Sequence, residues 1–233
     1  MDSGLKIESG WAEHAGFANW LVNKKKPELV VDLGTYQGLS ALAFKHKNDK
    51  KVITIDKKIG KKYLKYLENN GIECRESLFD DEVDSFENNS IDMLHIDGDH
   101  KIDAVANDII KWAPKVSIGG IILMHDVWNP AFKGPLQVFA KSIDGFKLMF
   151  LKGNGLGIIT HDENIMRAIY QEWGKDLIGL NIIQFLVSYI ERKDLWIKVL
   201  SESSVRDQAL EGLREKTDLL LMDRVWQEGL PES

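Results

Sequence analysis

The fold is decided by a short stretch near the N-terminus, Val30-Val31-Asp32-Leu33-Gly34-Thr35-Tyr36-Gln37-Gly38. An apolar run contains an acid near its end, and glycines follow that acid two and six positions later. This pattern is typical of a buried strand that turns sharply into a helix, because glycine allows a close backbone approach that a Cβ would prevent. The N-terminus of the following helix, near Gly38 to Ser40, offers free N–H groups and a positive dipole end that suit a carboxylate.

A second apolar run, residues 52–55, ends in Asp56, 24 residues after Asp32. In doubly wound folds, an acid at the end of the second strand can accept hydrogen bonds from both ribose hydroxyls. The glycine turn and Asp56 together therefore predict a nucleoside-containing ligand. The spacing lacks the third glycine of the dinucleotide pattern, which disfavours a nicotinamide oxidoreductase but leaves it as an alternative.

Apolar runs and helical patterns alternate outward from this stretch. The sequence predicts helices over residues 8–23, 39–46, 61–69, 102–112 and 132–142, and strands over residues 29–33, 52–55, 72–75, 91–96, 120–124, 146–151 and 156–160. Gly153-Asn154-Gly155 is a turn signal, so the last two strands read as a hairpin. The alternation predicts an α/β fold with a Rossmann-like, doubly wound parallel sheet, to which the hairpin adds one antiparallel strand.

The pattern changes to helices only from about Asn164. We therefore expect a domain over residues 1–162, with an N-terminal helix, and a helical C-terminal extension over residues 163–233. Its apolar set is wider than one helix face, so the extension packs on the sheet domain or forms a homo-oligomer contact.

Composition narrows the classes of partner. The chain has 233 residues and a formal net charge of −6, so it has no basic surplus for nucleic acid. Its most apolar stretch, residues 177–190, is too short and too polar to span a bilayer. The single cysteine, Cys74, excludes an internal disulfide and multi-cysteine metal sites, and it suits the reducing cytoplasm. The first ten residues do not show a signal-peptide pattern.

Polar side chains gather after two further strands, in Leu94-His95-Ile96-Asp97-Gly98-Asp99-His100 and Met124-His125-Asp126-Val127. Adjacent parallel strands would bring three carboxylates and two imidazoles into one cleft, those of Asp97, Asp99, His100, His125 and Asp126. Such crowding needs a cation or a proton to offset the charge. Oxygen ligands favour Mg²⁺ or Mn²⁺, and imidazole also admits zinc or iron. His95 lies inside its strand and is expected in the core.

These motifs together are recognisable. The set Asp32-x-Gly34-x-x-x-Gly38, Asp56, residues 92–100, and Gly119-Gly120 through His125-Asp126-Val127 resembles the class I S-adenosylmethionine (SAM)-dependent methyltransferases. More narrowly, HIDGDH followed by Asp108, Trp112-x-Pro114 and GGxxxxHDV resembles a group often found near glycosyltransferases. That group is related to metal-dependent O-methyltransferases of antibiotic sugars and to the cephalosporin hydroxylase family. The resemblance covers roughly residues 29–160.

The resemblance implies a sheet of seven strands with an antiparallel last strand, and SAM as cofactor. It places Gly34 and Gly38 against the methionine end of SAM, Asp56 at the ribose and Ser77 near the adenine. The full set of expected cofactor contacts is Asp32, Gly34, Thr35, Tyr36, Gln37, Gly38, Ser40, Asp56, Ser77 and Asp97.

In the metal-dependent relatives, an acid ending the fourth strand and an acidic pair ending the fifth bind a divalent ion. Asp97 and Asp126 match this pattern, while His125 stands where the relatives have a carboxylate. The expected metal ligands are therefore Asp97, His125 and Asp126, with Mg²⁺ or Mn²⁺ as the ion. A histidine three residues after the first acid serves as base in the relatives, so His100 is the expected base, with Asp97 beside it.

The resemblance implies transfer of a methyl group to a hydroxyl of a sugar or glycan-type acceptor. Two alternatives stay open beside the oxidoreductase. One is a metal-free small-molecule methyltransferase, and the other is a non-catalytic module that docks a fused or associated glycosyltransferase.

Overall fold

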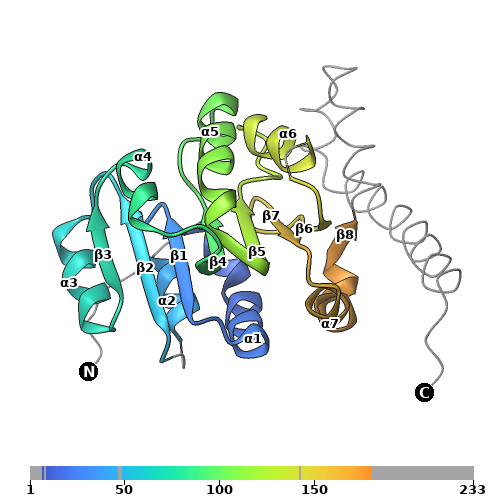
Figure 1. Cartoon of the computed structure of the whole chain (residues 1–233), viewed down its shortest axis with the longest axis horizontal. Coiled ribbons are helices and arrows are strands. Elements are labelled where there is room, and N and C mark those ends of the chain that lie inside the picture. The colour runs from blue at the N-terminus through green and yellow to red at the C-terminus, as the bar shows by residue number, and fades with distance from the viewer. Residues whose placement is uncertain (1–6, 8, 47–48, 142, 180–233) are drawn as a thin grey trace, which may run out of the picture.

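The computed structural model describes residues 7, 9–46, 49–141 and 143–179, and within them eight strands form one sheet. The strands are β1 (Leu29–Leu33), β2 (Lys51–Asp56), β3 (Glu73–Glu76), β4 (Ile91–Ile96), β5 (Val116–His125), β6 (Phe146–Phe150), β7 (Leu156–Thr160) and β8 (Leu177–Gly179). They lie in the order β3-β2-β1-β4-β5-β7-β6-β8 (Figure 1). The first five in this order are parallel, β7 is antiparallel to β5 and β6, and β8 is antiparallel to β6.

Helices cover both faces of this sheet (Figure 1). They are α1 (Ala15–Lys25), α2 (Leu39–Lys45), α3 (Lys61–Asn69), α4 (Phe79–Glu82), α5 (Ile102–Trp112), α6 (Gly134–Lys141) and α7 (Glu163–Trp173). Short 3-10 helices accompany them at Gly10–His14, Val83–Ser85, Ala113–Lys115 and Gly174–Asp176.

Each face of the sheet has its own apolar core. On one face, Trp112 of α5 and Phe139 of α6 are fully buried against strand residues. On the other, Phe44 of α2 and Leu67 of α3 pack with α1 and α7 around Trp11. Burial of apolar surface on both faces explains why the parallel strands are continuous hydrophobic runs.

The predicted α/β doubly wound fold is confirmed. β1 pairs in parallel with β2 on one side and with β4 on the other, so the strand order reverses between β1 and β4. In open α/β sheets, ligands bind outside the carboxyl ends of the strands at this reversal point. Asp56, Asp97 and Asp126 all lie at or just after those carboxyl ends.

The structure corrects the end of the sheet. The antiparallel β7 and its hairpin with β6 are confirmed, but an eighth strand follows, so seven strands is too few. The expectation of helices only after Asn164 is wrong for Leu177–Gly179, because β6 offers an edge that pairs with this segment and buries Leu177 and Ile178. Residues 180–233 of the expected extension lie outside the described residues, and the division into two parts stays a prediction.

Smaller differences concern the ends of elements. The predicted N-terminal helix is a 3-10 turn over Gly10–His14 followed by α1, because Ser9 caps the turn through the Trp11 N–H. The strand expected at residues 120–124 begins earlier, at Val116. Helix α4 was not predicted, since four residues are too few to show a helical period.

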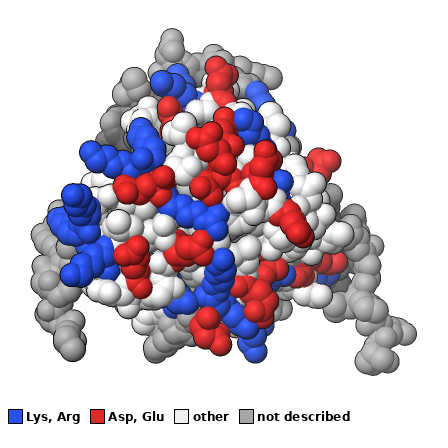
Figure 2. Space-filling model, turned by 60° about the vertical axis from the view of Figure 1, so that its left-hand side comes forward, with Lys and Arg blue, Asp and Glu red and all other residues white. Residues whose placement is uncertain are grey.

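Charged side chains protect the edge strand β3. Glu73 lies 2.9 Å from Lys51 and 2.6 Å from Arg75, and Arg75 also contacts Glu82 at 2.8 Å. Figure 2 shows the side of the molecule that Figure 1 has at the left, and there acidic and basic side chains lie intermixed. Paired charges along an edge oppose further strand pairing. Among the described helices, none is long and apolar enough to cross a membrane.

Candidate active site

The glycine turn after β1 is wedged between the ends of β2 and β4. Gly34 has a φ of 104°, and its N–H donates to the carbonyl oxygen of Ile55 at 2.9 Å. A Cβ on Gly34 would collide with the carbonyl oxygen of Asp97. Glycine is therefore required here by contact with β4 as well as by the left-handed backbone conformation.

Asp56 holds this turn in place and also lines the neighbouring cleft. Its Oδ2 accepts hydrogen bonds from the backbone N–H groups of Thr35 and Tyr36 at 3.0 and 3.1 Å. Its Oδ1 has a longer contact, 3.3 Å, with the N–H of Lys58. Oδ1 therefore has acceptor capacity left for a ligand hydroxyl, as the ribose prediction requires.

Asp32 faces inward, into a buried polar network. Its carboxylate accepts from Ser40 Oγ at 3.1 Å, Thr54 Oγ1 at 2.7 Å and His95 Nδ1 at 2.7 Å. Trp11 Nε1 donates to His95 Nε2 at 3.0 Å. An indole can only donate, so His95 accepts on Nε2 and is the neutral tautomer with its proton on Nδ1. This network fastens the N-terminal segment to the base of the turn.

The same network includes several residues that were predicted to contact the cofactor. Asp32, Thr35 and Ser40 are all buried and do not line the cleft, since Thr35 Oγ1 contacts Thr54 Oγ1 at 2.7 Å. Tyr36 is 67% exposed at the surface of the turn. The cofactor contacts of these residues stay predictions, and the structure gives the three buried ones a role in shaping the turn.

A cleft of about 490 Å³ opens beside the turn, at the carboxyl ends of the strands. That volume is in the range of small-molecule sites. Four of the predicted residues line it, Gly34, Asp56, Ser77 and Asp97. The other lining residues were not predicted as cofactor contacts, and are Lys57, Leu78, Phe79, Asp80, Gly98, Asp99, Ala104, Asn107 and Asp108.

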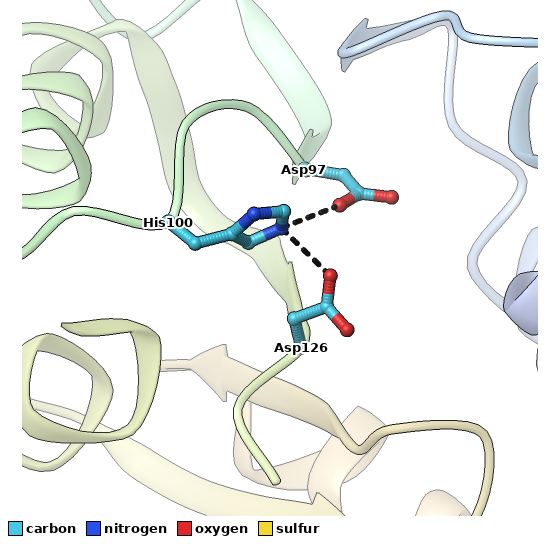
Figure 3. Close-up of side chains that lie close together, drawn as sticks. All are labelled: Asp97, His100 and Asp126. Carbon is cyan, nitrogen blue, oxygen red and sulfur yellow. Dashed lines mark ion pairs between the residues drawn. The ribbon is translucent and has the colours of Figure 1, made fainter. Parts of the chain in front are cut away.

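Asp97, His100 and Asp126 converge beside this cleft (Figure 3). His100 Nε2 lies 2.7 Å from Asp126 Oδ2 and 3.7 Å from Asp97 Oδ1. Asp97 and His100 follow β4, and Asp126 follows β5, so the pairing of these two strands brings them together. The predicted convergence is therefore present for these three residues, whereas Asp99, which was predicted to join them, is exposed and lies 3.8 Å from Lys101.

The side chain of His125 also lies beside this cluster. Its Nε2 lies 3.0 Å from the carbonyl oxygen of Gly153, and its Nδ1 lies 3.3 Å from Asp97 Oδ2 and 3.5 Å from Asp126 Oδ2. Neither His125 Nδ1 nor His100 Nε2 has a hydrogen bond of acceptable geometry with a described residue, although both are buried. Two buried imidazole nitrogens are thus near carboxylates without being satisfied by them.

The electrostatics of the cluster couple its four members. Contacts with Asp126 and Asp97 raise the pKa of His100 to about 9. Burial lowers the pKa of His125, but the same two carboxylates outweigh it and raise the pKa to about 10. Burial likewise opposes ionisation of Asp97 and Asp126, yet the two imidazoles hold the pKa of each well below its usual range. Two positive and two negative groups balance near neutral pH.

The N-terminal segment also contacts the cluster, through His14. His14 Nε2 lies 3.1 Å from the Gly153 carbonyl oxygen that His125 also contacts, and the two imidazole rings meet edge to face at 5.5 Å. Burial and the charge of His125 lower the pKa of His14 to about 4, so His14 is neutral at physiological pH. Sequence reasoning placed residues 8–23 in a helix and gave them no part in the site.

A turn after β5 holds two cluster members, and sequence reasoning missed it as well. Asn129 Nδ2 donates to Asp126 Oδ1 at 2.8 Å, and Asn129 N donates to the Asp126 carbonyl oxygen at 3.2 Å. Phe132 stacks flat on His100, with ring centroids 4.0 Å apart and planes 9° apart. The dipeptide Asn129-Pro130 is a turn signal that could have drawn attention to this segment.

The comparisons agree with this geometry. Residues 31–127 match the sequence model of a family described as a methyltransferase domain. A curated relative, the uncharacterized protein y4gI of Sinorhizobium fredii, is 26% identical over 246 residues. The alignment covers 91% of this chain and 25% of that protein, so the chain spans about a quarter of the length of the curated relative it matches.

Three solved structures are similar in fold. A methyltransferase from Geobacter sulfurreducens has a TM-score of 0.54 at 16% identity, covering 67% of this chain and 81% of its own. A candidate O-methyltransferase from Klebsiella pneumoniae has a TM-score of 0.53 at 17% identity, covering 67% and 83%. Cofactor-bound Rv0187 from MTB has a TM-score of 0.52 at 18% identity, covering 69% and 83%.

At these identities the similarity to the solved structures establishes the fold. The chain has the α/β fold of these methyltransferase structures, and residues 31–127 are the part of it that matches the family model. The matched residues run from the glycine turn through Asp56 and Asp97 to Asp126, and so include the strand ends that form the cleft and the cluster.

Proposed function

We propose that this protein transfers the methyl group of SAM to a hydroxyl oxygen of a small-molecule or glycan-type acceptor, with a divalent cation assisting. One observation carries the proposal. Asp97 lines the cleft beside the glycine turn and also belongs to the cluster with His100, His125 and Asp126. A donor methyl held in the cleft and an acceptor oxygen held at the cluster would therefore share one boundary residue, as in-line transfer requires.

The negative charge of the residues that line the cleft suits the positively charged groups of SAM. Five carboxylates line it, against the single lysine Lys57, and they belong to Asp56, Asp80, Asp97, Asp99 and Asp108. SAM carries a positive sulfonium and a positive ammonium group, which an acidic cleft attracts. Asp56 has an oxygen available for the ribose hydroxyls, as described above.

The cluster fits a divalent cation in its donor set. The Nε2 of His125 is held by a backbone carbonyl, and its Nδ1 faces Asp97 and Asp126. This is the usual arrangement of a metal-ligating histidine, whose second nitrogen is oriented by an outer hydrogen bond. Asp97, Asp126 and His125 would hold the ion, with Mg²⁺ or Mn²⁺ favoured by the carboxylates. A bound divalent cation would supply Lewis acidity that lowers the pKa of an acceptor hydroxyl.

His100 is the group placed to take the acceptor proton. Its Nε2 points toward Asp97 and Asp126 (Figure 3), and stacking with Phe132 fixes the plane of the ring. The two carboxylates raise the pKa of His100 to about 9, so the ring is mostly imidazolium near neutral pH and must lose its own proton before it takes that of the acceptor. The same carboxylates then stabilise the imidazolium that forms again. Asn129 orients Asp126, so the relative position of acid and imidazole is set before the acceptor binds.

A second candidate is a metal-free methyltransferase with His100 as base. The observation that favours it is the charge balance of the cluster at rest, in which two imidazolium groups and two carboxylates neutralise one another. The cluster therefore does not require a cation for neutrality. In this candidate His100 must lose its own proton before it acts as the base. Association with a glycosyltransferase and a homo-oligomeric state stay predictions.

Chelation separates the two candidates. We expect methyl transfer to a panel of sugars and nucleotide sugars to fall in EDTA and to recover with Mg²⁺ or Mn²⁺. Asp97→Ala and Asp126→Ala should each abolish the metal response, because each removes a charged ligand. Asp103→Ala, which removes an exposed carboxylate from α5, is the matched control and should respond as the wild type does. Full wild-type activity in excess EDTA, from protein purified without metal, would rule out the metal and leave His100 as a metal-free base.

A further inference from the structure

The tip of the hairpin between β6 and β7 lies between the N-terminal segment and the turn after β5. Gly153 has a φ of 55°, and a Cβ there would lie 2.7 Å from His14 Nε2 and 3.0 Å from the carbonyl oxygen of Gly10. On the other side, the carbonyl oxygen of Asn154 accepts a hydrogen bond from Trp128 N at 2.8 Å. The predicted turn is therefore packed between one segment that contacts the cluster and another that carries part of it.

Two imidazoles share the carbonyl oxygen at this tip. His14 Nε2 lies 3.1 Å from the Gly153 oxygen, and His125 Nε2 lies 3.0 Å from it. A carbonyl oxygen only accepts hydrogen bonds, so both Nε2 atoms carry a proton and both lone pairs of this oxygen are used. Because its Nε2 is held at the hairpin, His125 has only Nδ1 left, and that atom lies 3.3 Å from Asp97 Oδ2.

His14 also limits the movement of the His125 ring. The two rings meet edge to face, with centroids 5.5 Å apart and planes at 82°. His14 is 2% exposed and packs in turn against the rings of Trp11 and Phe150, at centroid distances of 5.9 and 6.0 Å. Rotation of the His125 ring would therefore cost the hydrogen bond to Gly153 and would push against a ring that is itself closely packed.

We propose that His14 is a positioning residue: it holds the Gly153 carbonyl oxygen and the ring of His125, so that the Nδ1 of that ring faces the two carboxylates of the cluster. The inference rests on the proposed function, which gives His125 a part in holding the cation. His14 is not among the described residues that converge on a possible cation position, so it acts through His125. An outer hydrogen bond of this kind fixes the tautomer and the orientation of a metal-ligating histidine.

NMR spectroscopy tests the shared contact without turnover. The two Nε2 protons each lie about 2 Å from one oxygen, hence at most about 4 Å from each other, and should give a mutual NOE. Long-range proton–nitrogen correlation spectra of histidine-labelled protein should show a protonated Nε2 in His14 and in His125. Absence of the NOE, or an unprotonated Nε2 in either ring, would overturn the assignment.

Titration of Mn²⁺, followed by EPR in the absence of cofactor and acceptor, tests the consequence. His14→Phe keeps an aromatic ring but loses the donor, and it should bind Mn²⁺ about 10–100-fold more weakly than the wild type. His14→Gln places an amide N–H near the position of Nε2 and should regain most of the affinity.

Trp11→Phe is the matched control for a loosened N-terminal segment. It removes the hydrogen bond from Trp11 to His95 and leaves both contacts on the Gly153 oxygen in place, so its Mn²⁺ affinity should equal that of the wild type. A loss in Trp11→Phe as large as in His14→Phe would overturn the assignment, because loosening of the segment would then explain both. An unchanged affinity in a folded His14→Phe would overturn it as well.

The two measurements separate this inference from the proposed function. If the wild type binds no Mn²⁺, the metal-assisted function fails, while the NOE and the two tautomers still decide whether His14 positions His125. Should His14→Phe not fold, His14→Asn takes its place beside His14→Gln, because the amide of Asn is one methylene shorter and should not restore the contact with Gly153. Equal Mn²⁺ affinities for these two variants would then overturn the assignment.

Discussion

Substituting Asp108 by Asn should stabilise the protein in the absence of cofactor, and by an amount that depends on pH. Folding raises the pKa of Asp108 from 3.8 to about 7, chiefly through burial. The folded state therefore holds the proton more tightly than the unfolded state does, so the wild type is most stable below the unfolded pKa and loses stability as pH rises toward 7. Asn cannot ionise and avoids this loss.

The size of the expected stabilisation follows from the pKa shift of Asp108. About three pKa units at about 1.4 kcal/mol each set a ceiling of about 4 kcal/mol, and water in the open cleft reduces this to about 2 kcal/mol. Urea unfolding followed by tryptophan fluorescence at pH 4 and pH 8 measures the difference. We expect Asp108→Asn to gain about 2 kcal/mol over the wild type at pH 8 and less than half of that at pH 4.

The exposed Asp103→Asn, on the same helix, should show no such pH-dependent gain. A gain for Asp108→Asn that is equal at the two pH values would refute the reasoning. A wild type more stable than Asp108→Asn at pH 8 would refute it too, since Asp108 would then be stabilised as a carboxylate.

Three further predictions concern the supporting contacts. His95→Phe removes the Nδ1–H group that donates to the buried Asp32 and should lower the free energy of unfolding by about 3–5 kcal/mol, whereas Trp11→Phe should lower it by only about 1 kcal/mol. A loss below about 1 kcal/mol for His95→Phe, measured by urea unfolding, would contradict the network. His100→Ala should lower turnover by about 10²–10⁴-fold and leave the affinity for S-adenosylhomocysteine in calorimetry unchanged, so a turnover near that of the wild type would remove its assignment as base. Phe132→Leu should abolish the upfield ring-current shift of the His100 imidazole protons in NMR spectra and should lower kcat more than it raises KM. Phe132→Tyr should restore the ring-current shift and kcat. Unshifted imidazole protons in the wild type would contradict the stacking.

The strand ends were predictable because parallel strands present their carboxyl ends at one edge of a sheet. Asp97 and Asp126 follow neighbouring strands, so their convergence with His100 needed only the strand pattern and the pairing of β4 with β5. The glycine turn and Asp56 were predictable for the same reason, since both follow strands that flank the reversal point of the sheet.

The direction of individual side chains was not predictable. The contact of Asp32 with the cofactor stays a prediction, and the sequence did not indicate that Thr54 and His95 on the two neighbouring strands would donate hydrogen bonds to its carboxylate. A sequence pattern gives the strand on which a residue lies, whereas hydrogen-bond partners from distant segments decide where its side chain is satisfied. The contact between Trp11 and His95 spans 84 positions and has no local signal.

Short elements escaped prediction for a different reason. Helix α4 has four residues and β8 has three, too few to show a period, and β8 exists because β6 offers an unpaired edge. The turn that carries Asn129 and Phe132 begins at Asp126, which adopts a φ of 57° that is uncommon for residues other than glycine. Its path, and hence the stacking on His100, depends on that one backbone conformation.

Calorimetric titration of SAM into the wild type and Asp56→Ala tests the central claim most directly. The account predicts one-to-one binding by the wild type, because the cleft beside the glycine turn suits a cationic nucleoside in volume and charge. Asp56→Ala should weaken binding by about 1.5–3 kcal/mol, since it removes a charged acceptor of the ribose hydroxyls. Undetectable binding of SAM by the folded wild type, or an unchanged affinity in a folded Asp56→Ala, would contradict the account.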